Sequence, residues 1–155
     1  MTYKKLLVFI IAFLILLIVL FRFSKQDSYR KMKVMIGGKE FVLEVADTDS
    51  LRGRGLSGRK SLQKYSGMIF LFDQKAHHSF WMKEMFIPLD FIWINETKIT
   101  DLSKDVQPPP NLYTKDLPLI IPKEPVNRVI EVNTGIIDEL KLKIGDEITF
   151  LNKYE

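Results

Sequence analysis

The residues best suited to chemistry in this sequence are two acidic side chains set inside apolar, strand-like runs. Asp90 lies in the run 89–95, and Glu131 lies in the run 128–132. A carboxylate is costly to bury alone, so each should have a partner or face a cleft. Two such groups could serve as general acid and base, or each could sit in a structural ion pair. The cationic residues available as partners are Arg54, Arg59, Lys83 and Arg128.

Other motifs known from enzymes and metalloproteins lack the context that they need. Residues 53–58 match the glycine pattern GxGxxG, but that fingerprint needs a βαβ unit, and none is predicted around it. His77 and His78 would point to opposite faces of a strand, and no third ligand stands at metal-site spacing. The chain has no cysteine and no GxSxG elbow. The sequence therefore assigns no catalytic residue, no metal and no cofactor.

The charge distribution argues against a nucleic-acid partner. The 155 residues carry a net charge of +4, but Lys4, Lys5 and Arg22 flank the apolar N-terminal segment. The remaining 20 basic residues face 19 acidic ones, so the rest of the chain is nearly neutral. No basic stripe for phosphates is implied.

The N-terminal segment is too apolar on every face for a helix of a small soluble domain. Residues 6–21 are an unbroken run of 16 apolar residues, extended by Phe23 beyond Arg22. As a helix the run spans about 24 Å, short of the roughly 30 Å hydrocarbon core of a bilayer, and Arg22 could snorkel. We expect residues 6–23 to be a membrane anchor, with a cleaved signal peptide as the alternative; small residues at cleavage positions are missing.

Two features of the sequence bear on the orientation of this anchor. Five basic residues between Arg22 and Lys33 follow the segment and favour a cytoplasmic domain. The short basic tail of residues 1–5 is instead typical of an exported protein. We expect a single-pass protein with an extracytoplasmic domain, although the two signals conflict.

Periodicity predicts one mainly β domain over residues 33–152, after a polar stalk at residues 24–32. Gly37-Gly38 separates two strand-like runs and predicts a tight hairpin, and Asp47–Ser50 offers caps for a short helix. Six of the seven prolines lie between Pro108 and Pro125, which predicts a long extended loop. We expect a compact β sandwich or barrel-like fold with one or two short helices. The further predicted strands are residues 67–72, 78–83, 89–95, 98–102, 128–132 and 147–151, with a helical turn near 136–140.

Blocks of residues follow one another in a specific order between residues 33 and 151. The blocks are Arg54-Gly55-Leu56, Arg59, Leu62, Gly67–Phe70, Ser79–Lys83, Ile87–Asp90, Val129–Asn133 with Gly135, and Gly145-Asp146. Together they resemble the bacterial and archaeal family known as domain of unknown function 192. The resemblance implies a compact, mainly β fold, often preceded by a signal or anchor, and it supplies no activity.

Two positions depart from the pattern of that family. Ser57 stands where a Met usually follows Gly-Leu, and Glu84-Met85 stands where Asn-Thr usually follows Trp-Met-Lys. If that Asn helps to form a site, this chain would bind something different or nothing.

The polar and aromatic members of the blocks form the candidate binding site. Trp81 could equally pack in the core. The leading hypothesis is a membrane-tethered, extracytoplasmic binding or accessory module, which the sequence favours over an enzyme. The alternatives are a hydrolase with Asp90 and Glu131 as acid and base, and an interaction domain without a small-molecule site; the ligand or protein partner stays open. The site residues are Arg54, Arg59, Trp81, Lys83, Asp90 and Glu131.

Overall fold

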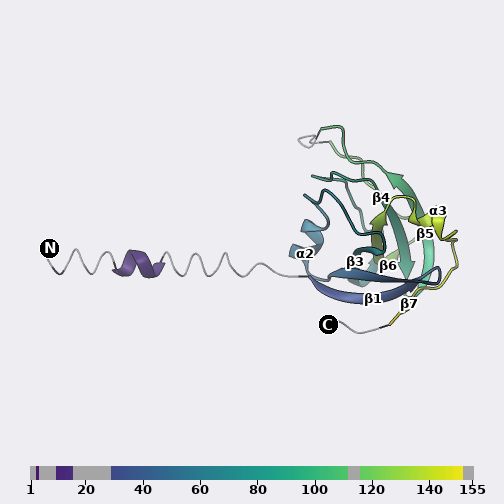
Figure 1. The fold of residues 1–155 in the computed structure, drawn as a ribbon, viewed down its shortest axis with the longest axis horizontal. Coiled ribbons are helices and arrows are strands. Elements are labelled where there is room, and N and C mark those ends of the chain that lie inside the picture. Colours follow the sequence, from purple (N-terminus) through teal and green to yellow (C-terminus); the bar gives the residue numbers. More distant parts are fainter. Residues whose placement is uncertain (1–2, 4–9, 16–28, 112–115, 152–155) are drawn as a thin grey trace.

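Seven strands and two short helices make up the domain. The computed structural model describes residues 3, 10–15, 29–111 and 116–151, and Figure 1 shows the arrangement of the elements. In chain order the elements are β1 (Arg30–Ile36), β2 (Lys39–Ala46), α2 (Asp49–Arg54), β3 (Ser66–Ala76), β4 (Leu89–Asn95), β5 (Lys98–Val106), β6 (Val126–Asn133), α3 (Ile136–Glu139) and β7 (Thr149–Phe150).

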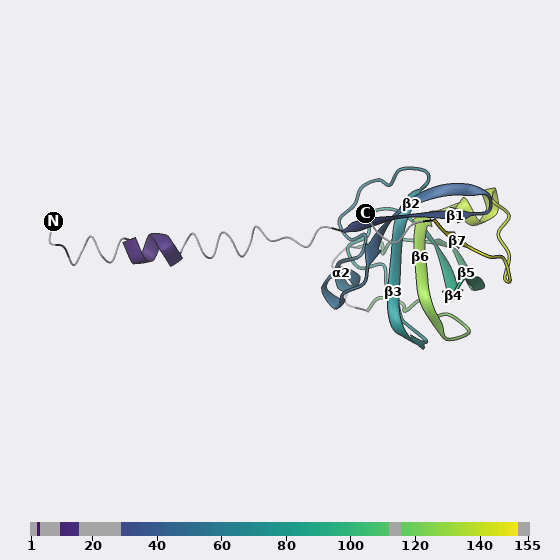
Figure 2. The same ribbon diagram turned by 90° about the horizontal axis from the view of Figure 1, so that it is seen from below.

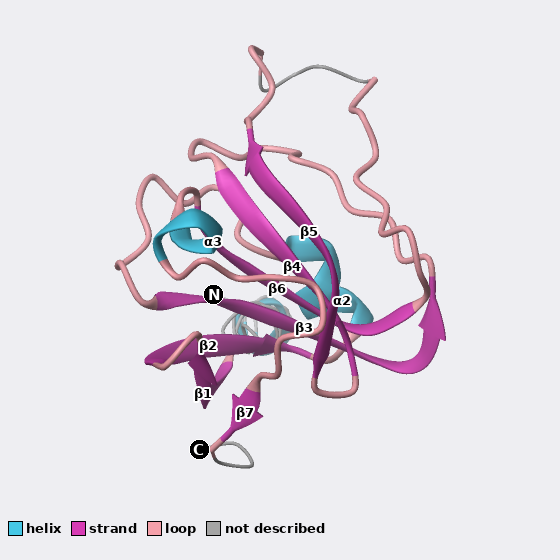
Figure 3. Ribbon diagram, turned by 90° about the vertical axis from the view of Figure 1, so that its right-hand side faces the viewer, coloured by secondary structure: helices cyan, strands magenta, loops and turns pink. Residues whose placement is uncertain are grey.

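All seven strands belong to one sheet in the order β5-β4-β6-β3-β2-β1-β7. Every neighbouring pair is antiparallel except β2 and β3, which run parallel. The sheet curls into a half-barrel (Figure 3), and Figure 2 shows β3 and β6 side by side near its middle. The prediction of a mainly β fold with one or two short helices is confirmed, and the sheet is a single curled one rather than a sandwich of two.

The predicted hairpin opens the domain. Ile36 pairs with Lys39 across Gly37 and Gly38, whose φ angles of 54° and 77° lie in the left-handed region that glycine adopts without strain. Alternation along β2 buries Phe41 and leaves Val42 exposed. β1 begins at Arg30, so the last three residues of the predicted stalk pair with β2.

The C-terminal segment links the two edges of the half-barrel. On one side it contacts the start of β5, where the Ile99 amide donates to the Asp146 carbonyl at 2.9 Å. On the other side Thr149 and Phe150 pair with β1, and the Leu151 amide donates to the Lys33 carbonyl at 2.9 Å. Residues 145–151 therefore bridge the first and last strands of the curl.

Two apolar clusters lie on the two faces of the sheet. The inner cluster fills the concave side and includes Ile136 and Ile137 of α3. The outer cluster lies under α2 and the loops that follow β3 and β5; Leu51 of α2 belongs to it. Its buried members are Ala46, Leu51, Leu56, Met68, Phe70, Met82, Met85, Leu89, Phe91, Trp93, Val126 and Val129.

Two predictions about local structure are wrong. Residues 78–83 are not a strand: only Phe80 forms an isolated bridge, with Ile120, because Pro88 and the turn at Glu84 (φ 56°) end any regular pairing.

A βαβ unit does surround the glycine pattern, since parallel strands β2 and β3 are joined through α2. The glycines nevertheless lie at the end of α2, with Gly55 as its C-cap, whereas the dinucleotide fingerprint places them before the helix.

The predicted anchor, residues 6–23, falls mostly outside the described residues. Its described part, residues 10–15, is helical and has apolar side chains about half exposed. Within the part of the chain that the structure describes, no helix reaches the length and apolarity needed to span a membrane.

Candidate functional site

Glu131 points from β6 into the outer side of the sheet. Its neighbours Ile130 and Val132 belong to the inner cluster, so alternation turns the carboxyl group the other way. The residue is only 5% exposed. Among the described residues, its carboxyl group makes no hydrogen bond and no ion pair, which is unusual for a buried acid.

A pocket of about 300 Å³ lies over this carboxyl group. Phe70 and Phe72 of β3 line it together with Glu131, α2 contributes one wall, and the loop after β3 contributes the other. Exposed residues such as Trp81 mark its mouth, since Trp81 is 48% exposed while Glu131 is buried. The pocket thus has aromatic sides and one acidic group at its buried end.

The α2 wall carries two arginines that are held in place. Thr48 caps the helix by accepting from the Leu51 amide. Arg52 donates to the Leu71 carbonyl at 2.7 Å and to Asp49 at 2.7 Å, and its guanidinium lies 5.1 Å from the centre of the Phe72 ring. These contacts keep the Arg52 charge at the wall and away from Glu131.

The opposite wall is formed by residues 78–85. His78 stacks on Phe72, with ring centres 3.5 Å apart. Phe80 packs edge-on against Phe70 at 4.8 Å and exchanges two backbone hydrogen bonds of 2.9 Å with Ile120. The wall is therefore tied both to β3 and to the proline-rich loop.

The two walls are joined at one end by hydrogen bonds. The Ser57 hydroxyl donates to the Lys83 carbonyl at 2.9 Å, and the Gly58 amide donates to the Glu84 carbonyl at 2.9 Å. Ser57 and Met85 both line the pocket. The two positions that depart from the resembled family pattern are thus neighbours in the wall of one pocket.

Gly67 allows β3 and β6 to come together beneath the pocket. A Cβ atom at this position would lie 2.1 Å from the backbone oxygen of Glu131. Any other residue would push the two strands apart at the point from which the acidic side chain projects. Close packing of β3 against β6 therefore explains why the block Gly67–Phe70 begins with glycine.

Burial alone sets the acidity of Glu131. Desolvation raises its pKa from 4.5 to about 8, and no neighbouring charge or hydrogen bond offsets it. At neutral pH the group is therefore mainly the neutral acid, which has one O–H to donate. A neutral donor at the end of an aromatic pocket can hold the acceptor oxygen of a ligand.

Asp90, the other predicted acid, has a structural role. It projects from β4 to the opposite face of the sheet and is 1% exposed. One carboxyl oxygen accepts from the Ile137 amide at 2.9 Å and the other accepts from the Asp105 amide at 2.9 Å. Asp90 thus holds the start of α3 against β5, and the predicted pairing of Asp90 with Glu131 in one site is wrong.

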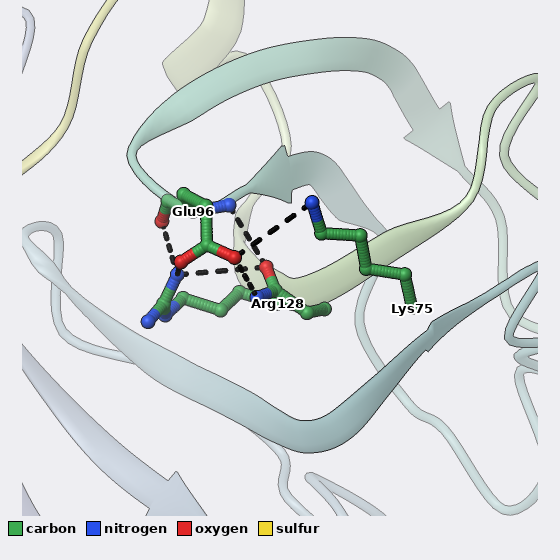
Figure 4. A network of polar contacts seen from close by, with 4 residues as sticks. Lys75, Glu96 and Arg128 are labelled. Atoms are coloured by element: carbon green, nitrogen blue, oxygen red, sulfur yellow. Dashed lines mark hydrogen bonds and ion pairs between the residues drawn. The ribbon is translucent and has the colours of Figure 1, made fainter.

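Three predicted cationic partners also lie elsewhere. Arg59 forms a two-pronged ion pair with Glu44, with one contact at 2.8 Å. Lys83 is exposed and does not line the pocket. Arg128 contacts the backbone and carboxylate of Glu96 in the β4–β5 turn, beside Lys75 (Figure 4).

The structure therefore brings together three of the six predicted site residues: Arg54, Trp81 and Glu131 all line the pocket. Arg54 also lies over the ring of Tyr29, 4.8 Å from its centre. Arg52 and Phe72 also line the pocket but are not among the predicted site residues, because Arg52 carries no pattern of its own and Phe72 is predicted only as part of a buried strand. Met85 lines it too, at the Glu84-Met85 position that departs from the resembled family pattern.

The two histidines do not share a site. His77 contacts the Pro122 carbonyl through Nδ1 at 3.0 Å, while His78 lies against Phe72. Within residues 29–111 and 116–151, no three acidic or histidine side chains come together in a way that could hold a metal ion.

Comparison with known proteins confirms the resemblance found in the sequence. Residues 32–150 match the family DUF192, described as "Uncharacterized ACR, COG1430". None of the curated proteins matches the chain.

Two solved structures share the fold. A putative transcription regulator from Sinorhizobium meliloti 1021 is 25% identical and superposes with a TM-score of 0.69 over 81% of this chain and 97% of its own. A protein of unknown function from Novosphingobium aromaticivorans DSM 12444 is 27% identical, with a TM-score of 0.64 over 76% of this chain and 82% of its own. The curled sheet is therefore similar to that of other bacterial proteins.

Proposed function

We propose that this chain, which belongs to the DUF192 family, is a membrane-tethered module that binds a small, largely apolar molecule in the pocket over Glu131. The observation that carries the proposal is the Glu131 carboxyl group, which is buried, faces the pocket and has no partner among the described residues. The carboxyl oxygens are open to the pocket; among the described residues, the fully buried side-chain oxygen without a hydrogen-bond partner is Asn95 Oδ1 instead. A ligand in the pocket could therefore accept the hydrogen bond of Glu131, a contact worth about 0.5–1.5 kcal/mol.

The lining favours a ligand with an aromatic or similarly flat apolar body. Phe70, Phe72, Phe80 and Trp81 surround the space, whose volume of about 300 Å³ is near the lower limit for small-molecule sites. The protonated Glu131 carboxyl group would donate a hydrogen bond to a carbonyl or similar acceptor at the buried end of the pocket. A cationic ligand is disfavoured, because the α2 wall carries two positive charges, Arg52 and Arg54, and one negative charge, Asp49.

Three one-ring compounds with different head groups test this proposal. Benzamide carries a neutral acceptor, benzylamine a cation and benzoate an anion. We expect saturation-transfer NMR to detect benzamide most strongly at pH 6–7. Well above pH 8 its affinity should fall about tenfold per pH unit, as the donor is lost.

Two variants of Glu131 separate the role of the donor from that of shape. Glu131→Gln keeps an N–H donor without a titratable proton, so benzamide binding should persist and lose its pH dependence. Glu131→Leu keeps the bulk and removes the donor, so binding should drop. If wild type and Glu131→Leu bind all three compounds alike, the pocket is not a recognition site.

The tether is supported by the sequence alone. The apolar run at residues 6–21, between Lys4-Lys5 and Arg22, and the missing cleavage positions favour an anchor that is retained. Lys4 and Lys5 directly before the apolar run are typical of an exported protein and favour an extracytoplasmic domain. Alkaline washing of membranes should leave the chain in the pellet, and protease added outside the cytoplasmic membrane should digest the domain. Release by alkaline wash would contradict the anchor, and protection from protease would reverse the orientation.

A second candidate, a hydrolase, rests now on Glu131 alone. An acid whose pKa is raised to about 8 can act as a general acid at neutral pH. Asp90 cannot assist it, because it faces the other side of the sheet. A hydrolase predicts turnover of ester or amide derivatives of benzyl compounds that disappears in Glu131→Gln; the binding module predicts occupancy without turnover.

A further inference from the structure

The loops beside the pocket mouth are paired over a short distance. Phe80 and Ile120 donate to each other's carbonyl groups at 2.9 Å, which is the hydrogen bonding of an antiparallel pair. Both side chains are partly buried and pack against the outer cluster. Residues directly before and after such a pair point to the opposite face.

This alternation turns three large apolar side chains outward. Trp81, Leu119 and Ile121 are 48%, 56% and 50% exposed. We refer to these three residues as the Trp81 patch. Phe86 on the same loop is also exposed, whereas within residues 29–111 and 116–151 the remaining exposed large apolar residues are Val42, Ile144 and Leu151 on other elements. Apolar exposure gathered in this way marks an interaction surface.

The charges near the patch do not favour an acidic partner. Lys83 and Lys123 are exposed on the two loops, but so are Glu84, Asp116 and Glu124. Among the described residues of these loops the exposed charges are thus two cations and three anions, a balance that does not favour attraction to nucleic acid or to anionic lipid. Binding at this surface would depend on burial of the apolar side chains.

The patch lies at the end of the domain where the predicted tether leaves. Tyr29, the first described residue of the domain, donates from its hydroxyl to the Gly55 carbonyl at 3.0 Å and lies under Arg54. Arg54 and Trp81 line the same pocket. The start of the domain is therefore separated from Trp81 by the width of one pocket.

The predicted tether is too short for the domain to rotate its Tyr29 end away from the bilayer. Five residues, 24–28, connect Phe23 to Tyr29, and fully extended they bridge about 20 Å at most. A domain of this size is roughly 30–35 Å across. The end of the domain that carries Tyr29 must therefore stay near the bilayer.

We propose that the Trp81 patch docks on the surface of the bilayer that holds residues 6–23, with Trp81 in the interfacial region. This inference rests on the tether of the proposed function. Trp is enriched at membrane–water interfaces, because its ring is apolar and its N–H is polar. The pocket then opens next to the membrane, so its ligand arrives from or leaves into the bilayer interface.

The two tryptophans of the chain make the test direct. Trp93 is fully buried, so a quencher in the lipid reaches only Trp81. The full chain is reconstituted in phosphatidylcholine vesicles, and its emission is compared with that in vesicles of phosphatidylcholine brominated close to the headgroup. We expect wild type to lose most of its Trp81 emission in the brominated vesicles. Trp81→Phe, which leaves only Trp93, should show no quenching.

A second variant tests the patch without touching the reporter. Leu119→Ser with Ile121→Ser changes only exposed side chains, so the domain should still fold and bind benzamide, but quenching of Trp81 should fall. Equal emission in the two kinds of vesicle, with the chain retained after alkaline wash, would overturn docking and leave the tether intact. A chain that alkaline wash removes from the vesicles would overturn the tether and, with it, the docking.

Discussion

Asp90 and Glu131 lie in the neighbouring strands β4 and β6, and Asp90 pairs in register with Val132, the residue next to Glu131. Alternation therefore sends the two carboxyl groups to opposite faces. On the inner face Asp90 receives two backbone amides, and on the outer face Glu131 meets a pocket. One side chain stabilises the fold, and the other is left available for a ligand.

The free energy of unfolding should depend on pH through Glu131. Its folded-state pKa is raised from 4.5 to about 8, so between these values the folded chain keeps a proton that the unfolded chain has lost. The stabilisation is complete below pH 4.5 and is lost at up to about 1.4 kcal/mol per pH unit as the pH rises towards 8. Urea denaturation at pH 5 and pH 8 should show this loss in wild type and a smaller one in Glu131→Gln. If the free energy of unfolding changed equally between pH 5 and pH 8 in wild type and Glu131→Gln, the raised pKa of Glu131 would be contradicted.

Removal of the Asp90 carboxylate should destabilise the domain without changing the pocket. Asp90→Ala leaves the amides of Ile137 and Asp105 without acceptors, at a cost of about 2–4 kcal/mol. Asp90→Asn keeps one acceptor and should cost less. Denaturation measures the cost, and unchanged benzamide affinity at a temperature where both variants are folded serves as the control.

At the scale of elements, the strands with clear alternation were predictable, and those set by distant partners were not. Gly37-Gly38 and the apolar face of β2 specify a hairpin locally, and β4 was predicted with the bounds that the structure has. The segment around Phe80 has strand-like residues, but its partner is Ile120 in a proline-rich loop, which limits it to one bridge. The parallel pairing of β2 with β3 depends on α2 packing, which no local pattern reveals.

Gly67 should be intolerant of a side chain because β3 and β6 meet there. Gly67→Ala would place its Cβ 2.1 Å from the Glu131 backbone oxygen, so we expect a loss of more than about 3 kcal/mol or failure to fold. Gly53→Ala is the matched control: Gly53 lies in α2 with nothing within 4 Å of its Cβ position, and Ala there should stabilise by up to about 1 kcal/mol. Thermal denaturation of the two variants should give opposite shifts.

At the scale of the whole molecule, the half-barrel depends on the segment that bridges its edges. Ile148 lies in this segment, is 2% exposed and belongs to the inner cluster. The last strand could be predicted at its place in the chain. The bridging of the two sheet edges could not, because the bonds of this segment to Lys33 and Ile99 join residues that are distant in the sequence. Likewise the candidate site could be predicted only in part: its residue types were recognised, but α2 and the loop after β3 determine which of them meet.

Ile148→Ala should therefore destabilise the domain by about 2–4 kcal/mol. Ile144, directly before this segment, offers a control, since its side chain is exposed and Ile144→Ala should be nearly neutral. Equal stability of the two variants in urea would show that residues 145–151 do not hold the edges together.

Glu131 is proposed to be a neutral acid that donates a hydrogen bond to a ligand at the buried end of the pocket. The most direct measurement is an NMR titration of the Glu131 side-chain carboxyl carbon, without ligand and with saturating benzamide. We predict a pKa of about 8 without benzamide and a higher one with it, because the ligand binds the protonated form. A carboxyl group that titrates near 4.5 and does not respond to benzamide would show that Glu131 is neither a neutral acid at pH 7 nor a ligand contact.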